Sequence, residues 1–180
     1  MLLYLDIDGV LIPGPDDHGN TPSTHTIHHV TPTGYDTPVT IWLNPRHGSQ
    51  IQDLLADTGL APVWCTSWRS DASRLIAPLL GFPAWPHVPL PRLPLTTSHP
   101  GGYLWKRDYL ARHAADAPLA WIDDDFTTSD HTWAVARTTS GRPTLLVQPE
   151  HRLGLQAGHL LTIKSWAATV TAAGPASHSA

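Results

Sequence analysis

The chain has 180 residues, and 41% of them are hydrophobic, which is enough apolar material for the core of one domain. Only 14% are charged and the formal net charge is −4, so we expect no broad basic surface for nonspecific nucleic-acid binding. A single cysteine, Cys65, excludes an intrachain disulfide and favours a reducing, cytoplasmic environment. No apolar run approaches the roughly 18 residues that a membrane span needs, so no membrane partner is expected.

An apolar run opens the chain and ends in two carboxylates. Residues 2–5 lead directly into Asp6 and Asp8, and Gly9 follows. This pattern is typical of a buried parallel strand, whose carboxyl end is where open α/β sheets bind ligands. Because alternate residues of a strand point to the same face, Asp6 and Asp8 can converge on one site if the strand continues through them. The alternative is a solvated acidic turn, since Asp-Gly also favours turns.

Residues 12–38 are rich in Pro, Gly, Thr and His and have no sustained period. We expect a long loop here, with room for a short hairpin around residues 33–35. Loops of this length in compact domains are usually functional, and this one follows the acidic strand end, so it is predicted to be a flap over the site. Three of its histidines, His25, His28 and His29, form a His-x-x-His-His pattern, but no cysteine or carboxylate is placed to complete a tetrahedral set with them. Solvated side chains are therefore favoured over a zinc site.

The rest of the chain alternates between strand and helix patterns. Strands are predicted at 39–43, 60–68, 118–122 and 144–147. Helices are predicted at 45–58, 71–80 (interrupted near Pro78), 103–115, 128–137 and 158–170, with an extended connection at 81–102. Alternating strands and helices indicate an α/β fold with a parallel sheet and right-handed crossovers. We predict a single domain over residues 1–171 and a flexible tail over 172–180.

Two further strands also end in polar residues. Thr66 and Ser67 follow the second buried strand beside a helix N-terminus, where they could bind an anion or simply cap the helix. The carboxylates of residues 123–125 follow the third, and such a run is costly unless it is solvated or binds cations. Because the ends of parallel strands share one edge, these groups are expected to meet the acids at residues 6–8.

Lys106 is one of only two lysines, and it falls in the first turn of a predicted helix. That end of a helix is already positive, so an anion nearby would relieve the electrostatic conflict. A solvated surface lysine is the alternative.

In this order along the chain, Asp6-x-Asp8, Thr66, Lys106 and the pair Asp123-Asp124 resemble the motifs of the haloacid dehalogenase-like (HAD) hydrolase superfamily. The Trp-x-Thr-Ser-Trp and Trp-Ile-Asp-Asp segments are also similar to the small HAD domains associated with RNA-repair proteins. The resemblance implies a three-layer, Rossmann-like parallel sheet with helices on both faces. The gaps that carry caps in this superfamily, here 12–60 and 68–105, also contain core elements, so a minimal cap or none is expected.

The resemblance also implies roles for the motif residues. Asp6 would be the nucleophile that forms an aspartyl-phosphate, and Asp8 would be the general acid and then the base. Mg²⁺ would lie between the Asp6 carboxylate, the Asp8 carbonyl and an acid of the later pair, Asp123 or Asp124, whose register with Asp125 stays ambiguous. Thr66 competes with Ser67 for the phosphate. The expected phosphate-binding residues are Gly9, Thr66, Ser67 and Lys106.

The function that the resemblance implies is that of a Mg²⁺-dependent phosphatase. An open site would suit a terminal phosphate on a large substrate, such as a nucleic-acid terminus, although a phosphorylated small molecule is also compatible. One alternative is a phospho-accepting signalling domain, but there the acid pair precedes the Thr and Lys. Another is a non-catalytic domain that keeps the metal and phosphate site. Four arginines near the motifs, each equally compatible with plain surface solvation, are candidates for contacting a phosphate backbone: Arg46, Arg69, Arg74 and Arg107.

Overall fold

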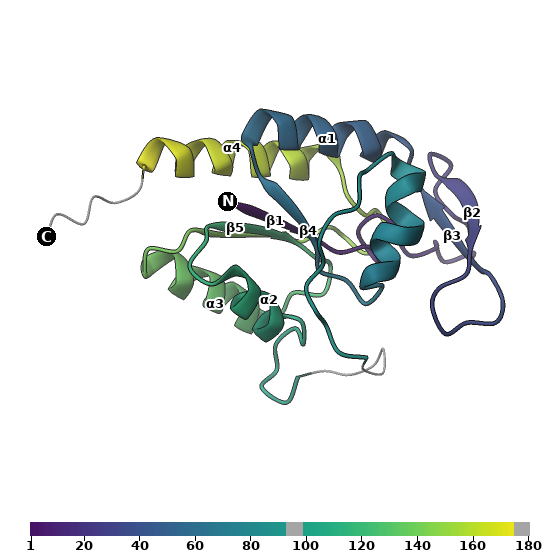
Figure 1. Cartoon of the computed structure of the whole chain (residues 1–180), viewed down its shortest axis with the longest axis horizontal. Helices are drawn as coiled ribbons and strands as arrows, with labels where there is room; N and C mark the ends of the chain where they lie inside the picture. Colours follow the sequence, from purple (N-terminus) through teal and green to yellow (C-terminus); the bar gives the residue numbers. More distant parts are fainter. Residues whose placement is uncertain (93–98, 175–180) are drawn as a thin grey trace, which may run out of the picture.

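A parallel sheet of four strands forms the centre of the molecule (Figure 1). The computed structural model describes residues 1–92 and 99–174. The strands are ordered β4-β1-β5-β6 and comprise β1 (Leu2–Leu5), β4 (Ala61–Trp64), β5 (Leu119–Ile122) and β6 (Thr144–Val147). Leu5 is paired with both Trp64 and Ile122, and Ile122 is paired with Val147. All four strands therefore end at the same level, and the residues that follow them share one edge.

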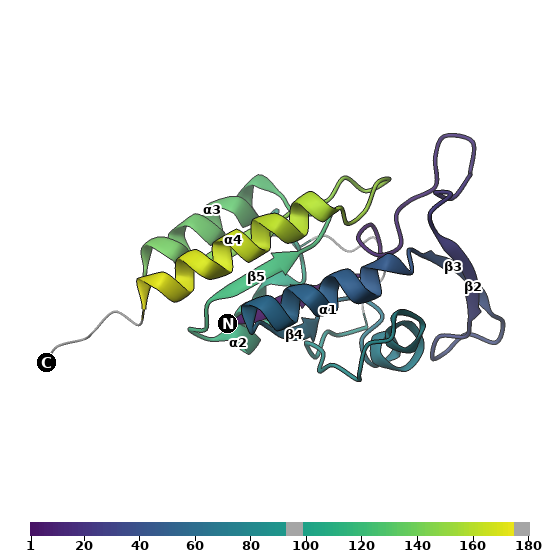
Figure 2. The same cartoon turned by 90° about the horizontal axis from the view of Figure 1, so that it is seen from above.

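Helices cover both faces of this sheet, as predicted (Figure 1). Helices α1 (Arg46–Thr58) and α4 (Ala157–Ala173) lie side by side on one face, which Figure 2 shows from above. Helices α2 (Arg107–Ala114) and α3 (Thr128–Thr139) lie on the other. Alternation along β1 explains the three layers, because Leu3 and Leu5 belong to one buried cluster and Tyr4 belongs to the other. Among the described residues, no helix is long and apolar enough to cross a membrane.

The segment after β1 contains a second, two-stranded sheet. Strands β2 (Thr26–Val30) and β3 (Val39–Leu43) pair antiparallel, so the predicted hairpin is present, and the strand predicted at 39–43 belongs to it rather than to the main sheet. The turn of this hairpin is tied to the helical segment that follows β4. Thr33 donates its backbone N–H and its hydroxyl to the Asp71 carboxylate at 2.7 and 2.9 Å. Among the described residues the insertion is no larger than this hairpin with its loops, so the cap is minimal.

Several predicted boundaries need correction. The helix predicted at 71–80 is a short π-helical turn, η1 (Ala72–Ile76), followed by a 3-10 turn, η2 (Ala77–Leu80). Asp71 holds the N-cap position of η1, but its carboxylate binds Thr33 and Arg74 and makes no capping hydrogen bond. Helix α2 begins at Arg107 instead of residue 103. Thr127, not residues 128–130, is the N-cap of α3, in a capping box with Asp130.

Helix α4 runs to Ala173 and so includes the first two residues of the predicted tail, where alanines favour the helix. Residues 175–180 of that predicted tail lie outside the described residues. Part of the predicted connection at 81–102 also lies outside them, and its described part joins the sheet only through an isolated bridge between His87 and Trp64.

His47 makes the stability of the fold depend on pH. Its ring is 3% exposed in the first turn of α1, and Nε2 donates a hydrogen bond to the Leu155 carbonyl at 3.1 Å. Burial lowers the pKa of His47 to about 4; the Leu155 hydrogen bond opposes this shift and His25 adds to it. An unfolded histidine titrates near pH ~6.5, so the unfolded chain takes up the proton first as pH falls. This stabilisation is complete above about pH 6.5 and is lost as the pH falls toward 4.

His47→Gln is expected to reduce the loss of unfolding free energy between about pH 7 and about pH 5. The wild type should lose about 2 kcal/mol more than the variant over this range, since each pKa unit is worth about 1.4 kcal/mol. The measurement is urea unfolding of both proteins at several pH values. Identical pH dependence of the two proteins would contradict the buried, neutral state of His47.

Candidate active site

Two buried carboxylates follow the central strands directly. The backbone N–H of Asp6 donates to the Ile122 carbonyl at 3.1 Å, and that of Asp123 donates to the Val147 carbonyl at 3.2 Å. These bonds continue the sheet by one residue beyond β1 and β5. The side chains of Asp6 and Asp123 are therefore held at the sheet edge, where the residues are 3% and 0% exposed.

Lys106 bridges these two carboxylates. Its Nζ donates to Asp6 Oδ2 and, at 2.8 Å, to Asp123 Oδ2, and the residue is only 5% exposed. Burial alone would lower the pKa of Lys106, but the carboxylates of Asp123 and Asp6 outweigh it and hold the pKa well above its ordinary value. Burial raises the pKa of Asp123, with Lys106 opposing this shift and Asp6 adding to it. Lys106 is thus a fixed positive charge shared by two acids.

A third carboxylate completes an acidic cluster at this edge. Oxygens of Asp6, Asp123 and Asp124 all lie within 4.8 Å of one another, so together they could hold a metal ion. Asp125, which competed with them in the sequence, is exposed. Burial raises the pKa of Asp124; His151 opposes the shift, and the charges of Asp125 and Asp6 add to it. Because one lysine cannot neutralise three acids, a hard divalent cation with oxygen ligands fits this cluster.

Gly9 makes room for the third carboxylate. Its φ is +71°, in the left-handed region that favours glycine, and a Cβ built there would lie 2.0 Å from Asp124 Oδ2. Asp124 cannot easily move aside, because His151 Nδ1 hydrogen-bonds the same oxygen at 2.6 Å. The structure thus relates Gly9 to Asp124, and the predicted phosphate contact of Gly9 stays a prediction.

Gly9→Ala is expected to displace Asp124 and to weaken binding of Mg²⁺ or Mn²⁺ by about tenfold or more, which is about 1.4 kcal/mol. It should also lower the unfolding free energy by about 1–3 kcal/mol. The matched control is Gly59→Ala, because Gly59 has φ +65° and no atom within 4 Å of a built Cβ. Gly59→Ala should lower the unfolding free energy through backbone strain alone, and calorimetry should show that its metal affinity is unchanged. Equal metal affinity in both variants would contradict this account of Gly9.

Asp8 lies in the turn after β1, outside the acidic cluster. The N–H groups of Leu11 and Ile12 bond to the Ile7 carbonyl, so the chain has left the strand by this point. The Asp8 carboxylate accepts Trp68 Nε1 at 3.1 Å and Ser67 Oγ at 3.3 Å. Although Asp8 is exposed, desolvation by the protein atoms around its carboxyl raises its pKa and Asp6 adds to the rise, while Trp68, Lys106 and Ser67 oppose it.

The two predicted hydroxyls beyond β4 have different surroundings. Thr66 is 1% exposed; its hydroxyl oxygen accepts the Trp68 backbone N–H at 3.4 Å and its carbonyl accepts the Arg69 N–H at 3.1 Å. The Ser67 hydroxyl donates to Asp8. Ser67 is therefore engaged with a carboxylate, whereas the Thr66 hydroxyl donates no hydrogen bond to any residue that the structure describes, which leaves its proton for a ligand.

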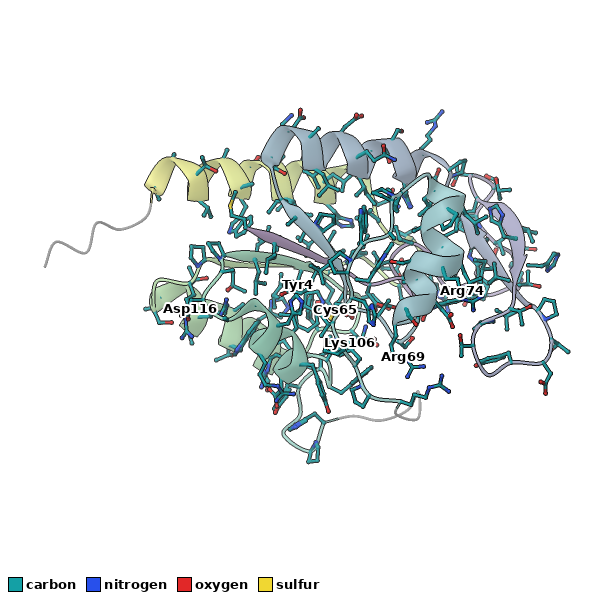
Figure 3. All side chains as sticks on the ribbon, in the orientation of Figure 1. Tyr4, Cys65, Arg69, Arg74, Lys106 and Asp116 are labelled. Atoms are coloured by element: carbon teal, nitrogen blue, oxygen red, sulfur yellow. The ribbon has the colours of Figure 1, made fainter. Side chains whose placement is uncertain are left out.

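The four candidate arginines also differ. Arg74 pairs with Asp71 at 2.7 Å, and Arg107 stacks 3.4 Å from the Tyr103 ring and bonds to Asp130. In the described part of the chain, the guanidinium groups of Arg46 and Arg69 have no ion pair or hydrogen bond. Figure 3 shows Lys106 and Arg69 toward the carboxyl ends of the strands, and Asp116 at the other end of the molecule. Within residues 1–92 and 99–174, Arg69 is also one of two non-glycine residues with positive φ, at 51°.

Two residues of this edge were not expected from the sequence: Trp68 as a partner of Asp8, and His151 as a partner of Asp124. His151 lies in the loop after β6, which packs on the segment that follows the first motif through a Gly14 N–H bond to the His151 carbonyl at 2.9 Å. The sequence offers a signal for His151, because this residue lies just beyond the strand predicted at 144–147. The carboxyl end of that strand must share the edge of the other parallel strands. No signal in the sequence pairs the Trp68 indole with Asp8. In the predicted loop, His28 and His29 lie on β2.

A family model described as the HAD domain in Swiss Army Knife RNA repair proteins matches residues 2–160. The chain belongs to this family. HAD domains are generally hydrolases of the phosphatase type, and an acidic cluster at the carboxyl edge of the sheet is compatible with that chemistry. No curated protein and no solved structure shows a significant match to this HAD domain.

Proposed function

We propose that this HAD domain is a Mg²⁺-dependent phosphomonoesterase that acts through a phosphorylated Asp6. The observation that carries the proposal is the cluster of Asp6, Asp123 and Asp124, whose oxygens lie within 4.8 Å, with Lys106 bound to two of them. The oxygen donors fit Mg²⁺, with Asp6, Asp123 or Asp124 and the Asp8 carbonyl as its ligands. When bound, Mg²⁺ would supply positive charge that allows an anionic nucleophile to approach an anionic phosphate.

In the first step, Asp6 attacks phosphorus, the bond from phosphorus to the leaving oxygen breaks, and Asp8 donates a proton to that oxygen. In the second step, Asp8 takes a proton from water, which attacks the phosphorus and frees Asp6. Lys106 neutralises charge on Asp6 and on the phosphoryl oxygens, and the Thr66 hydroxyl donates a hydrogen bond to one of them. The raised pKa of Asp8 suits an acid that must hold a proton in the first step.

We further propose that the substrate is a nucleic-acid terminus. The family description refers to RNA repair proteins, which supports this class of substrate. The minimal cap supports this class of substrate too, because an open site suits a terminal phosphate on a large molecule. The β2–β3 hairpin is held in place by Thr33, which donates to Asp71, and by the Thr31 carbonyl, which accepts from Arg74. The Arg69 guanidinium, three residues beyond Thr66 and without an ion pair among the described residues, would contact a phosphate next to the terminal one.

The test is phosphate release, with Mg²⁺ or with EDTA, from an aryl phosphate, nucleoside monophosphates, sugar phosphates and oligoribonucleotides bearing a 3′- or 5′-phosphate. We expect Mg²⁺-dependent release and the highest kcat/KM on an oligonucleotide. Arg69→Ala should lower kcat/KM about tenfold on the oligonucleotide and leave the aryl phosphate unchanged. Metal binding without turnover on any compound would contradict the phosphatase proposal. Equal kcat/KM on mononucleotides and oligonucleotides would contradict the proposed substrate alone.

A further inference from the structure

The Asp8 carboxylate is held by donors from a different part of the chain. Trp68 Nε1 lies 3.1 Å from both Asp8 oxygens, and Ser67 Oγ lies 3.3 Å from Oδ2. Both donors come from the turn after β4, about 60 positions along the chain from Asp8. Two donors restrict the two side-chain torsions of an otherwise exposed aspartate in a turn, so they select one orientation of its carboxyl group.

Packing fixes the stronger of these donors. Trp68 is half-buried, and its side chain packs against the hydrophobic cluster that contains residues of α1 and η1. An indole ring held in this way presents its one N–H in a fixed direction, with the apolar body buried and the polar tip at the surface. The hydrogen bonds to Asp8 are therefore a property of the folded scaffold rather than of two mobile surface side chains.

We propose that Trp68, assisted by Ser67, is a positioning residue that orients the Asp8 carboxyl toward the oxygen that leaves phosphorus. This inference rests on the proposed phosphatase function. In the first step the Asp6–phosphorus bond forms, the bond to the leaving oxygen breaks, and the Asp8 proton moves to that oxygen. Asp8 is then a carboxylate, the form to which Trp68 and Ser67 donate, and it stays oriented until it takes a proton from water.

The leaving group makes this inference testable. A nitrophenolate can leave phosphorus without taking up a proton. The alkoxide of a ribose must be protonated as it leaves, so only the ribose ester depends on a well-placed acid in the first step. Because kcat/KM covers events up to departure of the leaving group, it reports the acid role of Asp8. The value of kcat also includes attack by water, in which Asp8 acts as base for every substrate.

The experiment compares Trp68→Phe with wild type on nitrophenyl phosphate and on a ribose phosphate ester. Phe keeps an aromatic side chain, smaller than the indole, and removes the N–H donor. We expect kcat/KM to fall about tenfold or more on the ribose ester and less than about twofold on the aryl ester, while kcat falls on both. Trp166→Phe is the matched control, since Trp166 is half-buried, packs on the same cluster and has no Nε1 hydrogen bond in the described part of the chain. Trp166→Phe should leave kcat/KM unchanged on both esters.

Ser67→Ala is the second variant, in case Trp68→Phe does not fold, and it should shift the two substrates in the same direction by a smaller factor. Equal losses of kcat/KM on both esters would show that Trp68 is only structural, and no loss on either would equally overturn the inference. Wild-type protein that releases no phosphate with Mg²⁺ would instead overturn the proposed function.

Discussion

Asp6→Asn is expected to abolish phosphate release, with a loss of at least about a thousandfold in kcat/KM on every substrate. The amide has nearly the same shape as the carboxylate, and its oxygen can still accept a hydrogen bond from the Lys106 ammonium, so the variant should fold. It lacks the anionic oxygen that would attack phosphorus. Asp6 is also only 3% exposed and is paired with Lys106, so a carboxylate dissolved in the buffer cannot reach the site and act in its place.

Two measurements distinguish a nucleophile from a metal ligand in this variant. Acid-quenched wild type should carry a phosphoryl group on Asp6 by mass spectrometry, and the variant should carry none. Raising the Mg²⁺ concentration should restore little activity to Asp6→Asn. If excess Mg²⁺ restored activity, Asp6 would be a metal ligand and not the nucleophile. The matched control is Asp57→Asn on the surface of α1, where Asp57 pairs with Lys164 at 2.6 Å. Equal activity of Asp6→Asn and Asp57→Asn would end the nucleophile assignment.

Lys106→Met is expected to lower the unfolding free energy in metal-free buffer by about 3–5 kcal/mol. Methionine has a similar length, so the loss comes from charge rather than from packing. The variant leaves Asp6 and Asp123 buried next to each other, and next to Asp124, without the ammonium that bonds to two of them. Removal of one partner from a buried ion pair costs more than the pair contributes, because an uncompensated charge remains.

The second lysine of the chain provides the control. Lys164 pairs with Asp57 at 2.6 Å, but both side chains are more than half exposed, so Lys164→Met should cost less than about 1 kcal/mol. The proteins are compared by urea unfolding with EDTA and then with Mg²⁺. Mg²⁺ should stabilise Lys106→Met more than wild type, because a bound cation then takes over the charge of the missing ammonium. Equal losses in the two lysine variants would contradict the central place of Lys106.

The sequence alone was sufficient to predict the sheet and several residues at its edge. Apolar runs followed by polar residues locate β1, β5 and β6, and alternation within β1 separates Leu3 and Leu5 from Tyr4. These are local features, set by neighbours along a strand. A parallel sheet then brings Asp6 and Asp123 together at the ends of β1 and β5. Lys106, the N-cap residue of α2, meets them because α2 begins at the same edge of the sheet, although Lys106 and Asp6 are 100 positions apart.

Tertiary structure decided which groups actually touch. Alternation loses its meaning after a strand ends, so the sequence left the register of residues 123–125 open, whereas the fold places Asp124 over Gly9 and beside His151. The indole of Trp68 reaches Asp8 only because the turn after β4 packs against the turn after β1. The first strand and its acids could therefore be recognised from neighbouring residues. The partners that hold Asp8 and Asp124 depend on the paths of distant loops, which no local pattern encodes.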